Sequence, residues 1–401
     1  MNEKMLEISY CEVCGNENLV EVLDLGDHPL CDDLLPIGSK EECVEYPIQI
    51  LYCSNCYTAH QRFQVDKRSL FTNQYHYRAR MTGSVLTGMS DLVENCQRRF
   101  GDLRGKKVLD VGCNDGSLLN FFRLKGCRTF GVEPTDAAKD ADHQVLQEFF
   151  DDSSASKVLN EFGTPDFITF TNVFAHISNL GSLLESLKIL IGKQTVLVIE
   201  NHFLGAILDT GQFDTFYHEH PRTYSRKSFE IIARNLGLAL LDDQYVSRYG
   251  GNIRAYLGHG DPLRDRSIDE SKYLVDFQNL RSDIDIWKIS SGKLIQDYNE
   301  KYGAIRAKAF PGRAAILIKL LGLTEKNISA VYEIKGSIKI HHYIPGTKIP
   351  ILPEKDLYEL DDQSLPILNL AWHIPGEVRA NLTLNGYIGP VIDIKPMNAG
   401  D

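Results

Sequence analysis

The sequence lacks the features that would place it in a membrane or on nucleic acid. It contains no apolar run long enough to span a bilayer, and residues 1–10 carry Glu3, Lys4 and Glu7 in place of a cleavable signal. Its formal net charge of −11 leaves no basic excess for a phosphate backbone. We therefore expect a cytoplasmic protein with no membrane or nucleic-acid partner, although a small anionic substrate would need only a few local basic groups.

Low-complexity tracts and internal repeats are also missing, and the nine cysteines do not form an even set. An odd count in a cytoplasmic chain argues against a disulfide framework. The 401 residues are too many for one comfortable core, so we expect more than one domain. The predicted boundaries are an N-terminal domain at 1–75, a middle domain at 76–262, a connecting helix at 263–300 and a C-terminal domain at 301–401.

Strands and helices alternate through the middle of the chain, which is typical of a parallel α/β sheet. The apolar pattern predicts a helix at 117–124 and strands at 106–111, 127–132, 166–170 and 195–199. Helical spacing of apolar residues predicts the connecting helix. Further strands are predicted at 328–332, 366–372 and 387–392, so the C-terminal domain is expected to be a second, smaller α/β unit.

Two Cys-x-x-Cys pairs near the start of the chain have the spacing of metal ligands. Cys11 and Cys14 form the first pair, and Cys53 and Cys56 form the second. Two such pairs complete a tetrahedral shell of four thiolates, which leaves no open position and predicts a structural zinc ion. The alternatives are two unrelated buried pairs or a redox motif, and the surrounding segment lacks the βαβ pattern of the latter. The remaining cysteines are interpreted as packing residues.

A glycine-containing turn follows the first strand of the middle domain and predicts a nucleotide-like cofactor. The turn includes Asp110, Gly112, Asn114, Asp115 and Gly116, and an acid that suits ribose hydroxyls, Glu133, ends the next strand. A dinucleotide and S-adenosylmethionine both fit this layout. The turn is not Gly-x-Gly-x-x-Gly, and its carboxylates would repel a pyrophosphate but attract the ammonium and sulfonium of S-adenosylmethionine. We therefore favour the methyl donor, with a plain strand-to-helix turn as the remaining alternative.

A cluster of chemically active side chains follows the strand that ends near Glu200. Residues 213–225 include Tyr217, His218, Glu219 and His220. Ligands of doubly wound sheets bind at the carboxyl ends of the strands, so this cluster is more readily explained as a site than as packing. We expect His218, between the others, to point away.

Four sequence elements, in this order, resemble those of the sugar C-methyltransferases of deoxysugar biosynthesis. They are the two cysteine pairs, Gly112-Cys-Asn-Asp-Gly116, Asn172-Val-Phe-Ala-His176 and Tyr217-His-Glu-His220. The resemblance extends to residues 249–254, 343–350 and 371–377. It implies a class I methyltransferase domain with a Rossmann-like fold, flanked by a small zinc-binding domain and by a C-terminal Rossmann-like α/β domain that helps hold a nucleotide.

Enzymes of this family methylate C3 of a nucleotide-linked 4-keto-6-deoxyhexose. The resemblance implies that His220, or Tyr217 activated by it, removes the C3 proton, and that His176 polarises the enolate oxygen. Glu219 would orient an imidazole or hold a sugar hydroxyl. Asn172 joins the expected cofactor residues, and the expected substrate residues are Tyr77, Tyr224, Arg254 and Arg313.

One departure from the family concerns the C-terminal domain. The usual turn Gly-Ala-x-Ala-Lys-Gly is replaced by Ala309-Phe-Pro-Gly-Arg-Ala314, and the acid after the next strand is Glu333. We therefore expect a nucleotide preference other than thymidine diphosphate, with Arg313 replacing the lost phosphate-binding charge. The competing functions are an O- or N-methyltransferase of a small metabolite and a non-catalytic binding protein. We expect a monomer or a weak dimer.

Overall fold

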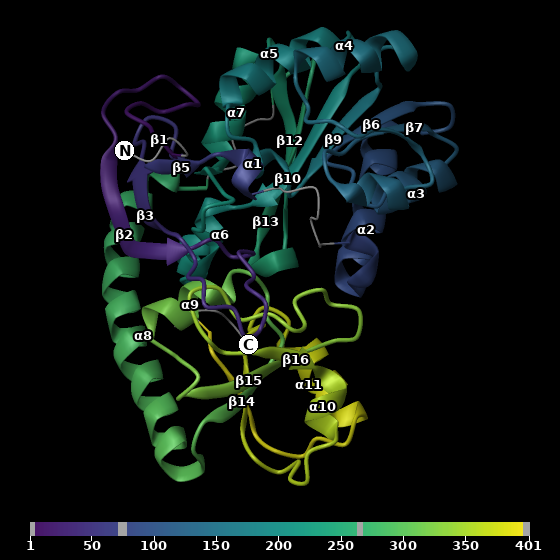
Figure 1. Cartoon of the computed structure of the whole chain (residues 1–401). Coiled ribbons are helices and arrows are strands. Elements are labelled where there is room, and N and C mark those ends of the chain that lie inside the picture. Colours follow the sequence, from purple (N-terminus) through teal and green to yellow (C-terminus); the bar gives the residue numbers. More distant parts are fainter. Residues whose placement is uncertain (1–4, 71–77, 263–267, 396–401) are drawn as a thin grey trace.

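The computed structural model describes residues 5–70, 78–262 and 268–395 (Figure 1). Tyr77, expected at the substrate site, lies outside these residues. An N-terminal cysteine domain and a middle α/β domain form the upper part of the view in Figure 1, and a smaller α/β domain lies below them. In the described residues, no helix is both long and apolar enough to cross a bilayer.

The N-terminal domain is built on an antiparallel sheet that borrows a strand from the middle of the chain. Its order is β11-β4-β3-β2, where β2 is Val20–Pro29, β3 is Glu45–Tyr52, β4 is Ala59–Gln61 and β11 is Arg222–Thr223. A separate pair joins β1 (Met5–Glu7) to β5 (Phe63–Val65), and α1 (Lys67–Leu70) follows. Because β11 comes directly after the Tyr-His-Glu-His segment, that segment is held by the cysteine domain.

The middle domain has a seven-stranded sheet in the order β12-β13-β10-β9-β6-β7-β8. Strands β6 to β10 are parallel, and β13 and β12 are antiparallel additions at one edge. The strands are Lys107–Val111 (β6), Arg128–Val132 (β7), Gln144–Leu146 (β8), Phe167–Thr171 (β9), Val196–His202 (β10), Ala239–Val246 (β12) and Asn252–Gly258 (β13). The chain leaves β6 first toward β7 and later returns to β9 on its other side, so a ligand crevice is expected where these strands end.

Helices cover both faces of this sheet. They are Gly83–Phe100 (α2), Ser117–Leu124 (α3), Asp152–Glu161 (α4), Leu180–Leu190 (α5), Leu204–Thr210 (α6) and Arg226–Asn235 (α7). Capping boxes begin two of them, since Asp151 and Ser225 each accept from the backbone N–H three residues on. Short 3₁₀ turns are Ala79–Met81 (η1), Asp136–Asp140 (η2), Phe174–His176 (η3), Phe213–Thr215 (η4), Arg248–Gly250 (η5) and Glu270–Lys272 (η6).

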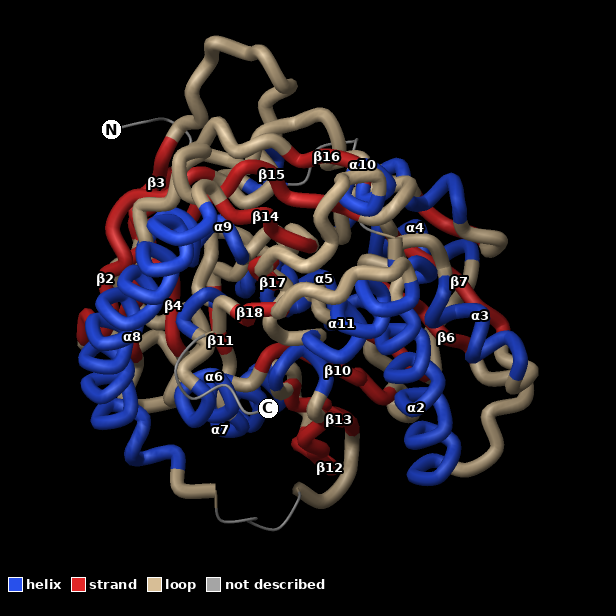
Figure 2. The backbone as a smooth tube through the Cα atoms, turned by 90° about the horizontal axis from the view of Figure 1, so that it is seen from below, coloured by secondary structure: helices blue, strands red, loops and turns tan. Residues whose placement is uncertain are grey.

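The long helix α8 (Tyr273–Tyr302) lies largely within the stretch 263–300 for which the sequence predicts a connecting helix, and it packs against both flanking domains. It runs beside β2 toward the C-terminal domain (Figures 1 and 2). Its Phe277 packs on Tyr52 of the cysteine domain with ring centroids 5.7 Å apart. Near the middle of the helix, Trp287 Nε1 donates to the carbonyl of Lys395 at 2.8 Å. The helix therefore packs against both the N-terminal and the C-terminal parts of the chain and is not a free linker.

The C-terminal domain is a parallel five-stranded sheet in the order β16-β15-β14-β17-β18. Its strands are Ile305–Lys308 (β14), Ile328–Glu333 (β15), Ile351–Pro353 (β16), Ile367–Asn369 (β17) and Val391–Asp393 (β18), and its helices are Ala314–Leu320 (α9), Glu354–Tyr358 (α10) and Pro375–Leu384 (α11). In chain order this is the 3-2-1-4-5 arrangement of a nucleotide-binding sheet. The predicted Rossmann-like class is confirmed. Strands β17 and β18 begin later than predicted, because Pro366 and Pro390 lie just before their first residues and cannot donate to a ladder, and β17 also ends early, at Asn369.

Candidate functional site

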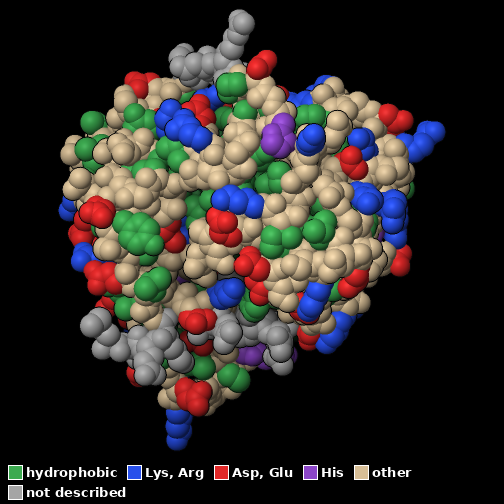
Figure 3. All heavy atoms as spheres, turned by 90° about the horizontal axis from the view of Figure 1, so that it is seen from above, with side chains coloured by type: hydrophobic (Ala, Val, Ile, Leu, Met, Phe, Trp, Pro, Cys, Tyr) green, Lys and Arg blue, Asp and Glu red, His purple; other side chains and the backbone are tan. Residues whose placement is uncertain are grey.

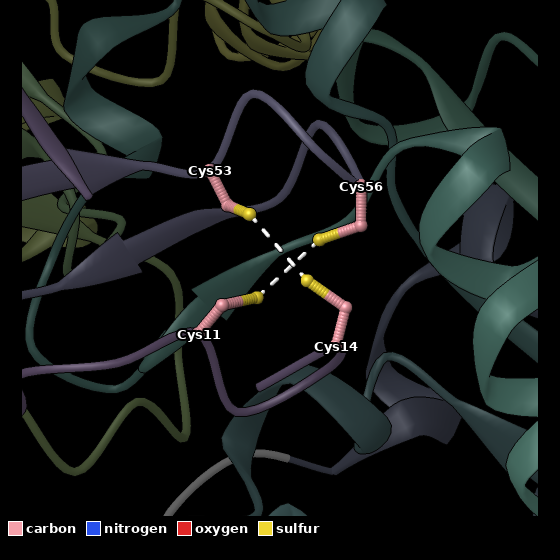
Figure 4. Close-up of side chains that lie close together, drawn as sticks. All are labelled: Cys11, Cys14, Cys53 and Cys56. Atoms are coloured by element: carbon pink, nitrogen blue, oxygen red, sulfur yellow. Dashed lines mark hydrogen bonds between the residues drawn. The ribbon is translucent and has the colours of Figure 1, made fainter. Parts of the chain in front are cut away.

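The four predicted zinc ligands lie together between two matching turns (Figure 4). Their sulfur atoms all lie within 4.8 Å of one another, with Cys11 and Cys56 at 3.3 Å and Cys14 and Cys53 at 3.6 Å. A tetrahedral Zn–S shell places sulfurs about 3.8 Å apart, so the cluster fits the ion. Each turn is closed in the same way, since Gly15 and Tyr57 have positive φ and donate to the carbonyls of Cys11 and Cys53 at 2.8 Å. The set has no position left for a substrate, which makes the site structural.

The second cysteine turn also supports the start of α7. The hydroxyl of Ser225 donates to the carbonyl of Cys56 at 2.8 Å, and Thr58 Oγ1 lies 2.7 Å from Ser228 Oγ. Ser225 caps α7 and is separated from the Tyr-His-Glu-His segment by the stretch 221–224, which contains β11. The metal site and the candidate catalytic segment are thus mechanically connected.

A cavity of about 550 Å³ lies between the middle and C-terminal domains. It opens at the carboxyl ends of the parallel strands, as the topology predicts. Acidic and basic side chains are interspersed over the face seen in Figure 3. Predicted site residues among its lining are Asp110, Gly112, Asn114, Glu133, Asn172, His176, Tyr217, Glu219, His220, Arg313 and Glu333.

The cofactor turn approaches the cavity through its backbone. Gly112 has φ 72°, and a Cβ at this position would lie 2.5 Å from the Val173 side chain, so only glycine fits. Glu133 is fixed behind the turn: Oε2 accepts from the N–H of Asn114 at 3.0 Å, and Oε1 accepts from the hydroxyl of Thr135 at 2.6 Å. A carboxylate has about four acceptor positions, so Glu133 can also bind ribose hydroxyls from the cavity side. The residues present therefore fit the adenosine end of S-adenosylmethionine.

The remaining acids and glycine of the turn take different positions. Asp110 lines the cavity, accepts from Thr169 Oγ1 at 2.7 Å, and has its pKa raised to about 7 by burial. Asp115 and Gly116, also expected at the cofactor, lie outside the lining. Asp115 instead accepts from the hydroxyl of Ser117 at 2.6 Å and from the N–H of Arg80 at 3.0 Å. It fixes the shape of the turn.

His220 is the centre of a group of rings at the cavity wall. Its Nδ1 lies 3.0 Å from the carbonyl of Thr215, and because a carbonyl only accepts, Nδ1 carries the proton of the neutral ring. The ring centroid lies 4.4 Å from that of Tyr217, 4.8 Å from His176 and 5.1 Å from His202. Burial, and then the neighbouring imidazoles, lower the pKa of His220 well below its ordinary value. His220 is therefore a neutral imidazole whose Nε2 can accept a proton.

Glu219 is shifted in the opposite direction. Burial raises its pKa to about 8, the charge of Asp32 adds to the shift, and Lys339 opposes it. The backbone carbonyl of Glu219 accepts from Nδ1 of His176 at 2.9 Å, and burial lowers the pKa of His176 to about 4. At neutral pH the cavity therefore holds a protonated carboxyl beside two neutral imidazoles. His218 points away as expected, with Nε2 3.0 Å from the carbonyl of Tyr46.

Two further histidines line the cavity and were missed by the sequence reasoning. His202 is the last residue of β10, and His373 comes from the loop before α11. Burial lowers the pKa of both to about 3. His202 could have been found, since it ends a parallel strand, but the predicted strand stopped at Ile199. His373 could not, because only tertiary structure brings the C-terminal domain to this wall.

The expected substrate residues divide into two groups. Tyr224 and Arg254 are not brought to the cavity, because both are fully buried and engaged elsewhere. Tyr224 OH accepts from Arg222 at 3.0 Å, and Arg254 Nε donates to Glu200 at 2.7 Å. Arg313 does line the cavity, with its Nε donating to Asp214 at 2.8 Å.

Comparison with known proteins gives matches to three families along the chain. Residues 11–71 match the family described as "Putative zinc binding domain", residues 80–242 match "Methyltransferase domain", and residues 249–386 match "C-methyltransferase C-terminal domain". Among curated proteins, the chain is 25% identical over 400 residues to "C-methyltransferase NovU" from Streptomyces niveus, covering 95% of this chain and 94% of that protein.

Solved structures resemble part of the chain at lower identity. One is magnesium protoporphyrin IX methyltransferase from Synechocystis PCC 6803 with bound S-adenosylmethionine, at 13% identity and TM-score 0.34, covering 48% of this chain and 89% of that one. Another is 1,6-didemethyltoxoflavin-N1-methyltransferase from Burkholderia thailandensis, at 14% identity and TM-score 0.33, covering 44% and 78%. The two structures cover similar shares of this chain and have similar TM-scores. With a methyltransferase domain and a C-methyltransferase C-terminal domain matched in one chain, this protein is an S-adenosylmethionine-dependent C-methyltransferase.

Proposed function

We propose that the enzyme methylates C3 of a nucleotide-linked 4-keto-6-deoxyhexose by way of an enolate. Carbon becomes a nucleophile when it lies beside a carbonyl, and the 4-keto group makes the C3 proton acidic. Such an acceptor requires a base for that proton and a hydrogen-bond donor for the developing oxyanion. An O- or N-methyltransferase would need no oxyanion donor beside its base.

The observation that carries the proposal is the fixed tautomer of His220. With Nδ1 held by the carbonyl of Thr215, the lone pair of Nε2 is available to take the C3 proton. Tyr217, with its ring 4.4 Å from that of His220, can relay or orient the proton transfer. Both line the cavity that also contains the cofactor turn.

Glu219 is the better donor to the enolate oxygen, in place of the role first expected of His176. Nδ1 of His176 lies 2.9 Å from the backbone carbonyl of Glu219, so its proton there is engaged within the fold. Glu219, with its pKa raised to about 8, keeps a proton at neutral pH. A carboxyl kept neutral by burial can stabilise an oxyanion by donating to it.

The cofactor supplies an electrophilic methyl group when it is bound. Gly112 lets the backbone approach it, and Glu133 offers its carboxylate to the ribose hydroxyls. The name of the Streptomyces niveus relative, a C-methyltransferase, agrees with a carbon acceptor.

Product analysis with a labelled methyl donor tests the proposal. Nucleoside-diphosphate 4-keto-6-deoxyhexoses incubated with the enzyme and ¹³C-methyl donor should give a methyl signal on a quaternary carbon, with loss of the H3 signal in NMR. The matched control is the same sugar reduced at C4, which lacks the acidifying ketone and should remain unmethylated. A methyl group found on oxygen or nitrogen, or transfer to the reduced sugar at a similar rate, would contradict the proposal.

A further inference from the structure

The segment 249–254, to which the family resemblance extends, has a role that the site described so far does not explain. Its buried side chains Asn252 and Arg254 lie outside the cavity lining. Both donate instead to the carboxylate of Glu200, Arg254 through Nε at 2.7 Å and Asn252 through Nδ2 at 3.3 Å. These contacts lead from the segment toward the carboxyl ends of the central strands.

Glu200 determines which way the amide of Asn252 faces. Glu200 is fully buried and also accepts from the guanidinium of Arg248, so with Arg254 it has two cationic partners. A carboxylate between two guanidinium groups only accepts, so Asn252 must present its nitrogen to it. A flipped amide would place its oxygen against a carboxylate oxygen. The orientation is kept although Asn252 Oδ1 has no hydrogen-bond partner among the residues that the structure describes.

Asn252 in turn determines the orientation of Asn172. The same Nδ2 has a second hydrogen, which it donates to Asn172 Oδ1 at 3.0 Å. The backbone of Asn172 is held as well, since its φ is 54° and its N–H donates to the carbonyl of Glu200 at 2.7 Å. Asn172 lines the cavity, and in the described part of the chain its Nδ2 has no hydrogen-bond partner. With Oδ1 engaged, Nδ2 is the atom that remains for a ligand, and it can only donate.

The strand order indicates which ligand this donor meets. Strands β7, β6 and β9 are neighbours in the sheet, and the residues that follow them are, in the same order, Glu133, Gly112 and Asn172. The turns after β6 and β9 touch, since a Cβ on Gly112 would lie 2.5 Å from the Val173 side chain. A cofactor that binds Glu133 through its ribose and passes Gly112 therefore reaches Asn172 with its methionine end. Of the groups at that end, the carboxylate accepts hydrogen bonds, whereas the ammonium and the sulfonium do not.

We propose that Asn172 donates to the carboxylate of the cofactor's methionine end, and that Asn252, oriented by Glu200, is the positioning residue that fixes this donor. Without Asn252 the Asn172 amide is free to turn, and its oxygen would then repel the carboxylate. One hydrogen bond to a charged group changes affinity by about 10- to 100-fold. Residues 249–254 thus act on the cofactor without lining its site.

Calorimetric titration of the full chain with S-adenosylhomocysteine and with its decarboxylated analogue tests this assignment. The two ligands differ in the carboxylate alone, so the ratio of their affinities isolates the contact. The unaltered enzyme should bind S-adenosylhomocysteine more tightly, by about 10-fold or more. Asn172→Asp has the same shape and still accepts from Asn252 but cannot donate, so it should remove the preference. Asn252→Ala, which frees the Asn172 amide, should lower the ratio.

The controls separate positioning from general effects on the fold. Asn201→Ala removes a buried amide that is adjacent to Glu200 in sequence and lies outside the cavity lining, and it should leave the ratio unchanged. If thermal unfolding shows that Asn252→Ala does not fold, Asn252→Ser takes its place with the same expected result. An equal loss of affinity for both ligands in the Asn252 variant would reduce that residue to a structural role and overturn the inference. A ratio that survives Asn172→Asp, or an unaltered enzyme that binds both ligands alike, would overturn it too.

Discussion

At the residue scale, burial gives neighbouring side chains the protonation states that the chemistry needs. Low polarity favours the neutral form of any group, so it raises the pKa of Glu219 and lowers that of His220. The same burial therefore produces a hydrogen-bond donor and a proton acceptor side by side. The sequence singled out these residues as candidates, but their protonation states depend on packing that no short motif encodes.

Glu219 should make the stability of the folded enzyme depend on pH. Because its pKa is raised from 4.5 to about 8, the folded state binds this proton more tightly than the unfolded chain does between those values. The resulting stability is complete below about pH 4.5 and is lost as the pH rises to about 8. Glu219→Gln removes this titration, so the variant should gain free energy of unfolding relative to the native sequence from pH 5 to 8. The gain is at most about 1.4 kcal/mol per pH unit.

Denaturant unfolding at several pH values measures this difference. Glu325→Gln, at an exposed acid, serves as the control and should track the native sequence throughout. A Glu219→Gln difference that stays constant from pH 5 to 8 would show that Glu219 ionises normally in the folded state.

At the scale of helices and strands, the sequence predicted most accurately those elements whose apolar residues form one continuous pattern along the chain. The helix Ser117–Leu124 and the strand β6 (Lys107–Val111) were predicted to within one residue, because an apolar run ends at a glycine turn. The two-residue strand β11 gave no signal, since alternation cannot be read from Arg222 and Thr223 alone. Its partner β4 lies far away in the sequence, so only the structure reveals that the proposed catalytic segment is attached to the cysteine domain.

The zinc site should affect catalysis as well as folding. Its second turn binds the cap of α7, and β11 joins the same sheet, so loss of the metal should displace the segment that carries His220. Closed zinc sites contribute directly to folding free energy. Cys53→Ser together with Cys56→Ser should therefore abolish zinc binding, lower Tm by roughly 10 °C or more and reduce turnover.

Metal analysis, thermal unfolding and turnover check this expectation together. Cys43→Ser is the matched control, because Cys43 is partly buried but lies outside the cluster. One zinc per chain remaining in the double variant, or an unchanged Tm without zinc, would contradict the assignment.

At the scale of the whole molecule, two α/β domains face one cavity, and the proposed catalytic segment Tyr217–His220 lies at its wall. Asp214, in η4 just before Tyr217, accepts from Arg313 Nε and from Trp372 Nε1, each at 2.8 Å, and thereby joins the C-terminal domain to the proposed catalytic segment. The sequence predicted the cofactor turn and the Tyr-His-Glu-His cluster from local patterns. It could not predict this contact, the convergence of His202 and His373, or the burial of Tyr224 and Arg254, because each depends on how the domains pack.

Solvent exchange at C3 tests the central claim most directly. The keto sugar nucleotide is incubated in D₂O with S-adenosylhomocysteine in place of the methyl donor, and loss of the H3 signal is followed by NMR. The unaltered enzyme should exchange H3, and His220→Asn should slow both exchange and methylation by about 10²- to 10⁴-fold while cofactor affinity stays nearly constant. Tyr217→Phe should slow both rates in parallel, and His218→Gln, at a side chain turned away from the cavity, should remain close to the native rates. If H3 exchange stays fast in His220→Asn while methylation stops, His220 does not remove the proton and the enolate mechanism assigned to this site is contradicted.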